Sequence, residues 1–103
     1  MGHPMKIRAA SSNGVTEVKV LMNHVMETGL RKDASGALIP ALFITDVTAK
    51  LNDAVVLQAQ WSQAVSKNPY LSFKVKGGKP GDKVAISWAD NSGDSRTDEA
   101  VVS

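Results

Sequence analysis

The chain has 103 residues, the length of a single domain, and 43% of them are hydrophobic, as in an ordinary soluble protein. Twelve basic and ten acidic residues leave a formal net charge of only +2, so no nucleic-acid-binding surface is indicated. The absence of cysteine excludes disulfides, thiol catalysis and cysteine metal sites within this chain.

A single domain is expected to cover almost the whole chain. We expect Met5 to be the native start and residues 1–4 to be a cloning remnant, so that one domain covers residues 5–103. The first residues lack the apolar stretch of a signal peptide. No apolar run approaches the roughly 18 residues of a membrane span, so no membrane contact is expected.

Two strands are predicted at the start of the domain. Lys6 to Ser11 alternates, with Ile7 and Ala9 on one side, and suits an edge strand. The residues Ser11-Ser12-Asn13-Gly14 then predict a turn. Val15 to Met22 is a clearer strand, and its inward side chains are expected to be Val18, Val20 and Met22.

The longest segment without clean periodicity is Asn23 to Pro40. A loop of this length in a small domain is usually functional or disordered. Simple disorder does not suit its apolar content, which comprises Val25, Met26, Leu30, Leu38 and Ile39. The polar stretch Arg31 to Gly36 is predicted to be the tip of a hairpin.

Leu42 to Leu51 is predicted to be one long strand. One face would carry Phe43, Thr45, Val47, Ala49 and Leu51, and the other Leu42 and Ile44, so that the first half is apolar on both faces. Asn52-Asp53 predicts a two-residue hairpin turn into the next strand. In that strand Val55, Leu57, Ala59 and Trp61 would share one face and alternate with Val56, Gln58 and Gln60.

The C-terminal third predicts three more strands after a connector, Ser62 to Asn68, that has room for one helical turn. Tyr70 to Lys76 would face inward with Leu71, Phe73 and Val75. A glycine-rich connection then leads to a terminal hairpin that turns at Asn91-Ser92-Gly93-Asp94. Its first strand alternates, with Val84, Ile86 and Trp88 on the buried face.

About seven short strands and no convincing amphipathic helix define the expected fold. Turn signals recur roughly every 8–12 residues, which is typical of an antiparallel sandwich. The sequence therefore predicts an all-β protein, an immunoglobulin-like antiparallel β-sandwich, with Trp61 and Trp88 as its central core residues.

Few residues suggest chemistry. His24 and Glu27 are three apart and Asp33 follows, which could form a partial metal site, but zinc usually takes three or four ligands. The favoured alternative is that His24 holds a loop by a hydrogen bond. A second cluster could in principle perform acid–base catalysis, although turn formation and a surface ion pair suit it better: Asp90, Asp94, Arg96, Asp98 and Glu99. We predict no catalytic residue, no metal ligand and no cofactor, and hence no enzyme.

Several motifs, taken in their order along the chain, resemble the SoxZ family of bacterial thiosulfate oxidation. They are His24-Val25-Met26-Glu27-Thr28-Gly29 with Arg31-Lys32-Asp33, Ile39-Pro40-Ala41, Val65-Ser66-Lys67-Asn68-Pro69, and Trp88-Ala89-Asp90-Asn91 with Arg96-Thr97-Asp98-Glu99-Ala100. The resemblance runs from about Met5 to Ser103. It departs from the family pattern at Val25, where proline would follow the histidine, and at Asp53, where glycine is expected.

The resemblance implies a role without chemistry of its own. SoxZ proteins are immunoglobulin-like sandwiches that pair with SoxY, which carries sulfur intermediates on a cysteine of its flexible C-terminal arm. The pair presents that arm to SoxAX, SoxB and SoxCD in the periplasm, and a SoxZ chain is thought to be exported folded with its partner. The chain is therefore expected to be the non-catalytic subunit of a heterodimeric sulfur carrier. A stand-alone sandwich that binds a surface protein or carbohydrate is the alternative.

The apolar surplus around residue 42 predicts where a partner binds. A sandwich has one inner face per sheet, so apolar residues on a second face need a cover. Either the long loop provides it, with Met26 and Leu38 plugging the end of the sandwich, or a SoxY-like partner does. We predict a partner interface of ten residues: His24, Val25, Met26, Glu27, Thr28, Leu38, Ile39, Leu42, Phe43 and Ile44.

Overall fold

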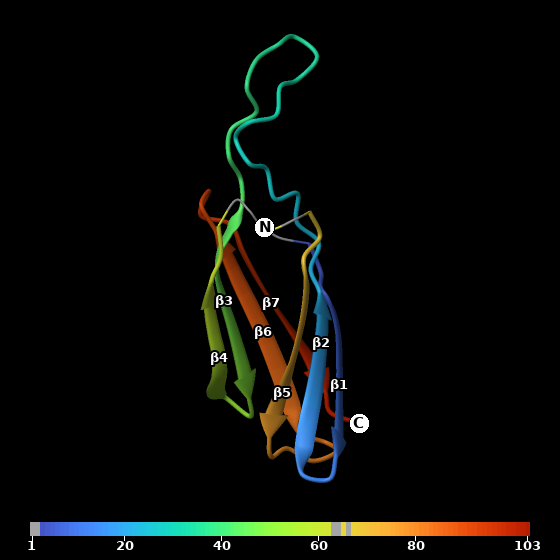
Figure 1. The fold of residues 1–103 in the computed structure, drawn as a ribbon. Coiled ribbons are helices and arrows are strands. Elements are labelled where there is room, and N and C mark those ends of the chain that lie inside the picture. Colours follow the sequence, from blue (N-terminus) through green and yellow to red (C-terminus); the bar gives the residue numbers. More distant parts are fainter. Residues whose placement is uncertain (1–2, 63–64, 66) are drawn as a thin grey trace.

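Two antiparallel sheets make up the protein in this computed structural model, which describes residues 3–62, 65 and 67–103 (Figure 1). One sheet has the order β1-β2-β5 and the other β4-β3-β6-β7. No helix occurs in the described ranges, and none could therefore span a membrane there. The strands are β1 (Lys6–Ser12), β2 (Val15–Leu21), β3 (Ile44–Leu51), β4 (Ala54–Gln60), β5 (Tyr70–Lys76), β6 (Lys83–Asp90) and β7 (Ser95–Val101). The predicted all-β sandwich is confirmed.

Two of the predicted turns are tight hairpins. Asn13 and Gly14 join β1 to β2 with φ of 52° and 76°, and Asn52 and Asp53 join β3 to β4 with φ of 49° and 69°. Two central residues with positive φ define the turn whose twist matches that of paired strands. Asp53 adopts this backbone although the resemblance led us to expect glycine there.

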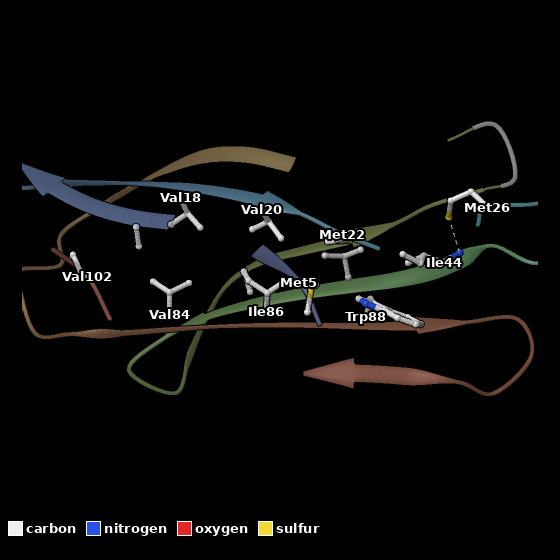
Figure 2. Packing of buried hydrophobic residues seen from close by; sticks show 13 residues of the cluster. Met5, Val18, Val20, Met22, Met26, Ile44, Val84, Ile86, Trp88 and Val102 are labelled. Carbon is white, nitrogen blue, oxygen red and sulfur yellow. Dashed lines mark hydrogen bonds between the residues drawn. The ribbon is translucent and has the colours of Figure 1, made fainter. Parts of the chain in front are cut away.

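The core lies between the two sheets (Figure 2). Alternation buries Val18 and Val20 of β2 against Val84 and Ile86 of β6, as predicted. Trp88 is confirmed as a core residue, with 3% of its surface exposed. Trp61 lies beyond the end of β4 and is only half-buried at the margin of the core, so its predicted central position was wrong.

A β-bulge at the start of β3 corrects the predicted faces of residues 42–44. The register with β6 shifts between Ile44, which lies opposite Asp90, and Asp46, which lies opposite Ala89. One extra residue reverses the alternation, so Ile44 and Val47 both point into the core. The expectation that Ile44 lies on the opposite face from Val47 was therefore wrong, and the strand begins at Ile44 rather than Leu42.

A second bulge corrects the predicted alternation of β4. Ala49 pairs with Leu57 and Lys50 with Val55, which leaves Val56 as the extra residue. Val55 is 51% exposed and so does not share the face of Leu57 and Ala59, which pack against the core. The helical turn expected within Ser62 to Asn68 falls largely on residues 63, 64 and 66, which lie outside the described residues.

The molecule is much longer than its strands, with extents of 54 × 20 × 20 Å. A strand of eight residues spans only about 26 Å. Figure 1 shows where much of the remaining length lies: the segment between β2 and β3 extends beyond one end of the sandwich. This segment contains most of the residues predicted to meet a partner.

Candidate functional site: a projecting hairpin and its anchor

Residues 27–42 form the projecting hairpin. At its base Glu27 and Leu42 exchange two backbone hydrogen bonds, with N–O distances of 2.6 and 3.0 Å. Further out, the Ile39 N–H donates to the Arg31 carbonyl at 2.8 Å. The predicted hairpin tip is confirmed, and two isolated bridges, Glu27 with Leu42 and Lys32 with Leu38, join the two sides of the segment.

The tip is built around one carboxylate. Oδ1 of Asp33 accepts hydrogen bonds from the Ser35 N–H at 2.9 Å, the Ser35 hydroxyl at 2.6 Å and the Ala37 N–H at 3.1 Å. These bonds, the Ser35 hydroxyl first, hold the pKa of Asp33 below its usual value. Asp33 therefore shapes the turn and is not available as a partner for His24.

Glu27 is likewise engaged, by Arg31 on the same side of the hairpin. A guanidinium nitrogen of Arg31 lies 2.5 Å from Oε1 of Glu27, and its Nε lies 3.1 Å from Oε2. The hydrogen bond from Arg31 lowers the pKa of Glu27 and in turn raises that of Arg31. No cluster of three or more possible metal ligands occurs in the described part of the chain.

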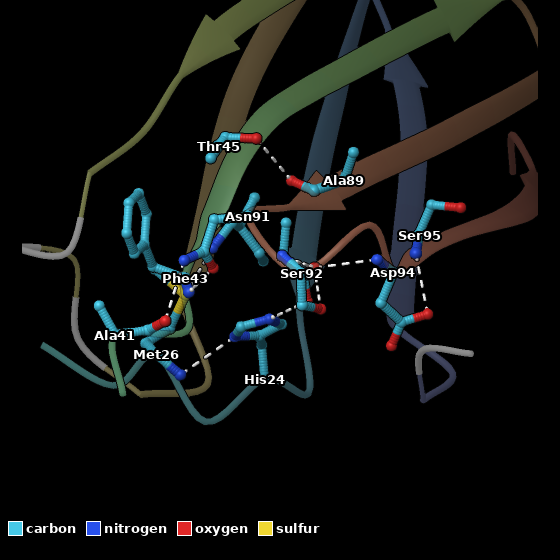
Figure 3. Close-up of polar contacts among 12 residues, drawn as sticks. His24, Met26, Ala41, Phe43, Thr45, Ala89, Asn91, Ser92, Asp94 and Ser95 are labelled. Carbon is cyan, nitrogen blue, oxygen red and sulfur yellow. Dashed lines mark hydrogen bonds and ion pairs between the residues drawn. The ribbon is translucent and has the colours of Figure 1, made fainter. Parts of the chain in front are cut away.

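His24 joins the hairpin to the sandwich. Its buried ring lies with Nε2 3.0 Å from Oδ2 of Asp90, and Nδ1 accepts the Met26 N–H at 3.0 Å (Figure 3). Because Nδ1 is the acceptor, the neutral ring carries its proton on Nε2 and donates it to Asp90. The ring also meets Trp88 edge-on, with centroids 5.0 Å apart. The interpretation of His24 as a residue that holds a loop is confirmed.

Asp90 receives His24 from the end of β6. Its other oxygen, Oδ1, accepts from the Ser92 N–H and hydroxyl at 2.9 and 2.7 Å and from the Asp94 N–H at 3.0 Å. Burial raises the pKa of Asp90, but the hydrogen bonds from Ser92, His24 and Asp94 together outweigh it and hold the pKa below its usual value. The group is a carboxylate at neutral pH.

The predicted surface ion pair in this acidic cluster is also present. A guanidinium nitrogen of Arg96 lies 2.8 Å from Oδ1 of Asp98. The hydrogen bond from Arg96 is the main cause of the lowered pKa of Asp98. Asp90 and Asp94 therefore belong to the turn and Asp98 to an ion pair, as the sequence analysis favoured.

Asn91 holds the outgoing foot of the hairpin. Its Oδ1 accepts the Phe43 N–H and its Nδ2 donates to the Ala41 carbonyl, both at 2.9 Å (Figure 3). Its own N–H donates to the Phe43 carbonyl at 3.1 Å. Asp90 and Asn91 thus fix both feet of the hairpin, and we call His24, Asp90 and Asn91 the anchor.

Met26 closes the end of the sandwich beneath the hairpin. Its backbone has φ of 48°, a left-handed conformation that non-glycine residues rarely adopt. Its side chain is buried, and Sδ accepts the Ile44 N–H at 3.4 Å. Met26 therefore turns the chain into the hairpin and fills the gap that this turn leaves.

The ten predicted interface residues fall into three groups. The buried ones are His24, Met26 and Ile44; the half-buried ones are Glu27, Ile39, Leu42 and Phe43; the exposed ones are Val25, Thr28 and Leu38. Met26 plugs the sandwich, whereas Leu38, 59% exposed on the hairpin, does not. Contact of these residues with a partner stays a prediction.

Sequence reasoning missed two asparagines that position the site. Asn91 was assigned only to a turn, and Asn68 only to a connector. Asn68 accepts the His24 N–H on Oδ1 at 3.1 Å and donates its own N–H to the His24 carbonyl at 2.9 Å. An asparagine side chain can bond to backbone N–H groups and to backbone carbonyls, but the partners of these two asparagines lie far away in sequence. Both residues fall within the motifs that carry the family resemblance.

Fold and site together define a small antiparallel β-sandwich that bears an anchored, projecting hairpin. Residues 5–101 match the family model described as "Sulphur oxidation protein SoxZ". The match covers nearly the whole chain, so the chain belongs to the SoxZ family and is a protein of sulfur oxidation. A search of curated protein sequences gives no match.

Proposed function

We propose that this protein is the non-catalytic subunit of a heterodimeric sulfur carrier. It scaffolds a SoxY-like partner, whose C-terminal-arm cysteine carries the sulfur intermediates of thiosulfate oxidation and presents them to SoxAX, SoxB and SoxCD. Membership of the SoxZ family supports this role. So does the absence of cysteine, because a covalent sulfur adduct of this kind needs a thiolate nucleophile.

The observation that carries the proposal is the exposed apolar surface of the projecting hairpin. Leu30 is 82% exposed and Leu38 59%, and Val25 at the base is 47% exposed. The anchor holds both feet of this hairpin by buried or bidentate hydrogen bonds. Apolar side chains on a projecting hairpin contribute little to the core of their own domain. Such surfaces are typical of protein interfaces.

Localisation belongs to the same proposal. We place the working complex in the periplasm, to which this chain travels folded together with its SoxY-like partner. Cell fractionation tests this directly. Removing the partner's export signal should leave both subunits in the cytoplasm, whereas independent export would leave this chain in the periplasm.

Co-purification tests the proposed function. The chain is expressed together with the SoxY-like subunit of the same source, with an affinity tag on only one of the two. We expect a stable complex of equal stoichiometry. A chain that elutes alone, with no measurable affinity for the SoxY-like subunit, would instead favour a stand-alone binding module.

A further inference from the structure

The two sheets have four edge strands, and they are not equally protected. β1 and β5 border one sheet, and β4 and β7 border the other. On the β1 and β7 side, the Ser11 N–H donates to the Ser103 carbonyl at 3.0 Å and the Ser103 N–H to the Ala9 carbonyl at 2.9 Å. β4 and β5 share no strand pairing in the described structure, so the sandwich is open on their side.

The two open edges differ in charge. β5 carries Lys74 and Lys76, both exposed, which is one of the ways in which proteins prevent strands from adding to an edge. β4 reads Ala-Val-Val-Leu-Gln-Ala-Gln and has no charged residue, proline or glycine. Its bulge lies at Val56, near the turn, and leaves the stretch from Leu57 to Gln60 regular. Uncharged strands of this kind readily pair with other strands.

The hydrogen-bond pattern shows which backbone groups β4 offers. The Trp61 N–H donates to the Thr45 carbonyl at 2.9 Å, one residue beyond the pair Asp46 and Gln60. Bonded and non-bonded pairs alternate in an antiparallel ladder, so Leu57 and Ala59 also bond to β3. The N–H and C=O groups of Gln58 and Gln60 therefore point away from β3, toward the open side.

The side chains of β4 present two different faces beside these groups. Leu57 and Ala59 are half-buried and pack on the margin of the core. Gln58 and Gln60 are exposed and line a shallow hollow of about 490 Å³ on the outer face, together with residues of β3. A strand that pairs with β4 would meet apolar side chains on one face and amides on the other.

We propose that β4 is a docking edge, to which an extended strand of the SoxY-like subunit adds antiparallel or parallel to the existing sheet. This inference rests on the proposed function and says where, besides the hairpin, the partner binds. Strand addition supplies main-chain hydrogen bonds that do not depend on sequence, while the flanking side chains give specificity.

Continuity with the hairpin favours this partner over a second copy. The edge ends at Trp61, whose bond to Thr45 places it two residues from Phe43 in the outgoing foot. One partner can therefore cover both the edge and the hairpin base. An interface of standard size buries roughly 800 Å² on each side, which is room for contacts with both. Two copies paired antiparallel through β4 would point their hairpins in opposite directions and leave both uncovered.

The test removes one outward N–H from each open edge. Gln58→Pro deletes a donor that does not bond to β3, and proline is tolerated at such edge positions. The matched control is Ser72→Pro in β5. There the Met22 N–H donates to the Pro69 carbonyl, and the same alternation turns the N–H of Ser72 outward. The affinity of each variant for the SoxY-like subunit is measured by titration calorimetry, with thermal melting of each isolated variant.

We expect Gln58→Pro to weaken the affinity at least about tenfold and Ser72→Pro to change it less than about twofold. The double variant Gln58→Lys, Gln60→Lys tests the same edge without a backbone change. It should weaken binding too, and it keeps the test valid if the proline variant does not fold.

Wild-type affinity in both β4 variants would overturn the docking edge while leaving the proposed function standing. Failure of the wild-type chain to bind any SoxY-like subunit would overturn both. A dimer of the isolated wild-type chain that Gln58→Pro abolishes would assign the edge to a second copy, contrary to the proposal.

Discussion

At the scale of single residues, hydrogen bonding to Asp90 accounts for the buried position of His24, which the sequence alone could also have assigned to a partial metal site. The Met26 N–H holds His24 in one tautomer, and Nε2 of His24 donates to Oδ2 of Asp90. The other oxygen of Asp90 accepts hydrogen bonds from Ser92 and Asp94. Each polar atom of this buried pair thus has a partner, which is the condition for burying such groups without a large cost. The pair holds the entry to the projecting hairpin in place.

Stability should depend on the ionisation of Asp90. Its pKa in the folded state is lowered, so its contribution to stability is present above the unfolded pKa of about 3.9 and is lost as the pH falls through the folded pKa. Asp90→Asn keeps the shape and removes the titration. At pH 7 we expect this variant to cost about 1–3 kcal/mol.

Urea unfolding of both proteins between about pH 3 and pH 7 checks this, since it spans the ordinary pKa of the group. The stability difference should shrink as the pH falls below about 4. The lowered pKa values of Glu27, Asp33 and Asp98 affect both proteins alike, so they cancel in the difference. A difference that stays constant over the whole range would show that Asp90 does not act through its charge.

Trp88 offers a second test at this scale. Its ring is buried beside His24, but its Nε1 has no hydrogen-bond acceptor among the residues that the structure describes. Trp88→Ala should cost roughly 3–5 kcal/mol, as for other large core side chains. Trp88→Phe should cost markedly less, because it keeps an aromatic ring and gives up no hydrogen bond. Equal costs in denaturant titrations would contradict this expectation and show that the whole indole is required at this position.

At the scale of elements, the projecting hairpin depends on a turn that is distant in sequence. Asn91 bonds the outgoing foot through both atoms of its amide, at Ala41 and Phe43. Asn91→Ala should therefore lower the free energy of local opening of the hairpin by up to about 3 kcal/mol, while the sandwich stays folded. Hydrogen exchange is the suitable measurement, because it reports local opening.

We expect faster exchange of the Glu27, Ile39 and Leu42 amides in Asn91→Ala and unchanged exchange within β6. Ser87→Ala is the control, since it also removes a side-chain hydrogen bond, to Thr97 at 2.9 Å, but far from the hairpin feet. Equal exchange rates in the two variants would show that Asn91 does not hold the hairpin.

The strands and turns were predictable because each is decided by nearby residues. Period-two alternation located the buried faces of β2, β5 and β6, and Asn-Gly and Asn-Asp located two tight turns. The bulges at residues 44–46 and at Val56 were not predictable. Whether a strand contains an extra residue depends on the neighbouring strands with which it pairs. Where it does, the bulge reverses the faces that alternation predicts.

The candidate site was predictable only in part. The apolar content of the long loop pointed to the right segment, and Arg31 to Gly36 marked its tip. The bulge, however, moved Ile44 into the core, and the anchoring roles of Asn68 and Asn91 arise from contacts between distant parts of the chain. Leu30, the most exposed apolar residue of the hairpin, was recognised as apolar but was not placed in the interface.

At the scale of the whole molecule, the proposed function assigns the sulfur-carrying thiol to the partner, because this chain of the SoxZ family has no cysteine. Treatment of the isolated chain with thiosulfate should leave its mass unchanged. In the complex, any sulfur adduct should appear on the SoxY-like subunit alone. Intact-mass spectrometry checks both, and a stable adduct on this chain would contradict the proposed division of labour.

The central claim is that the projecting hairpin is the surface that meets the SoxY-like partner. Leu38→Asp places a charge on the hairpin, where the side chain is 59% exposed. Val101→Asp makes the same kind of change at a residue that is 62% exposed on β7, away from the hairpin. The decisive measurement is the affinity of both variants for the SoxY-like subunit, with the melting of each isolated variant. We predict that Leu38→Asp weakens binding at least about tenfold, or 1.4 kcal/mol, while its melting and the affinity of Val101→Asp stay near wild type. Equal affinities of Leu38→Asp and Val101→Asp would contradict the claim and place the interface elsewhere.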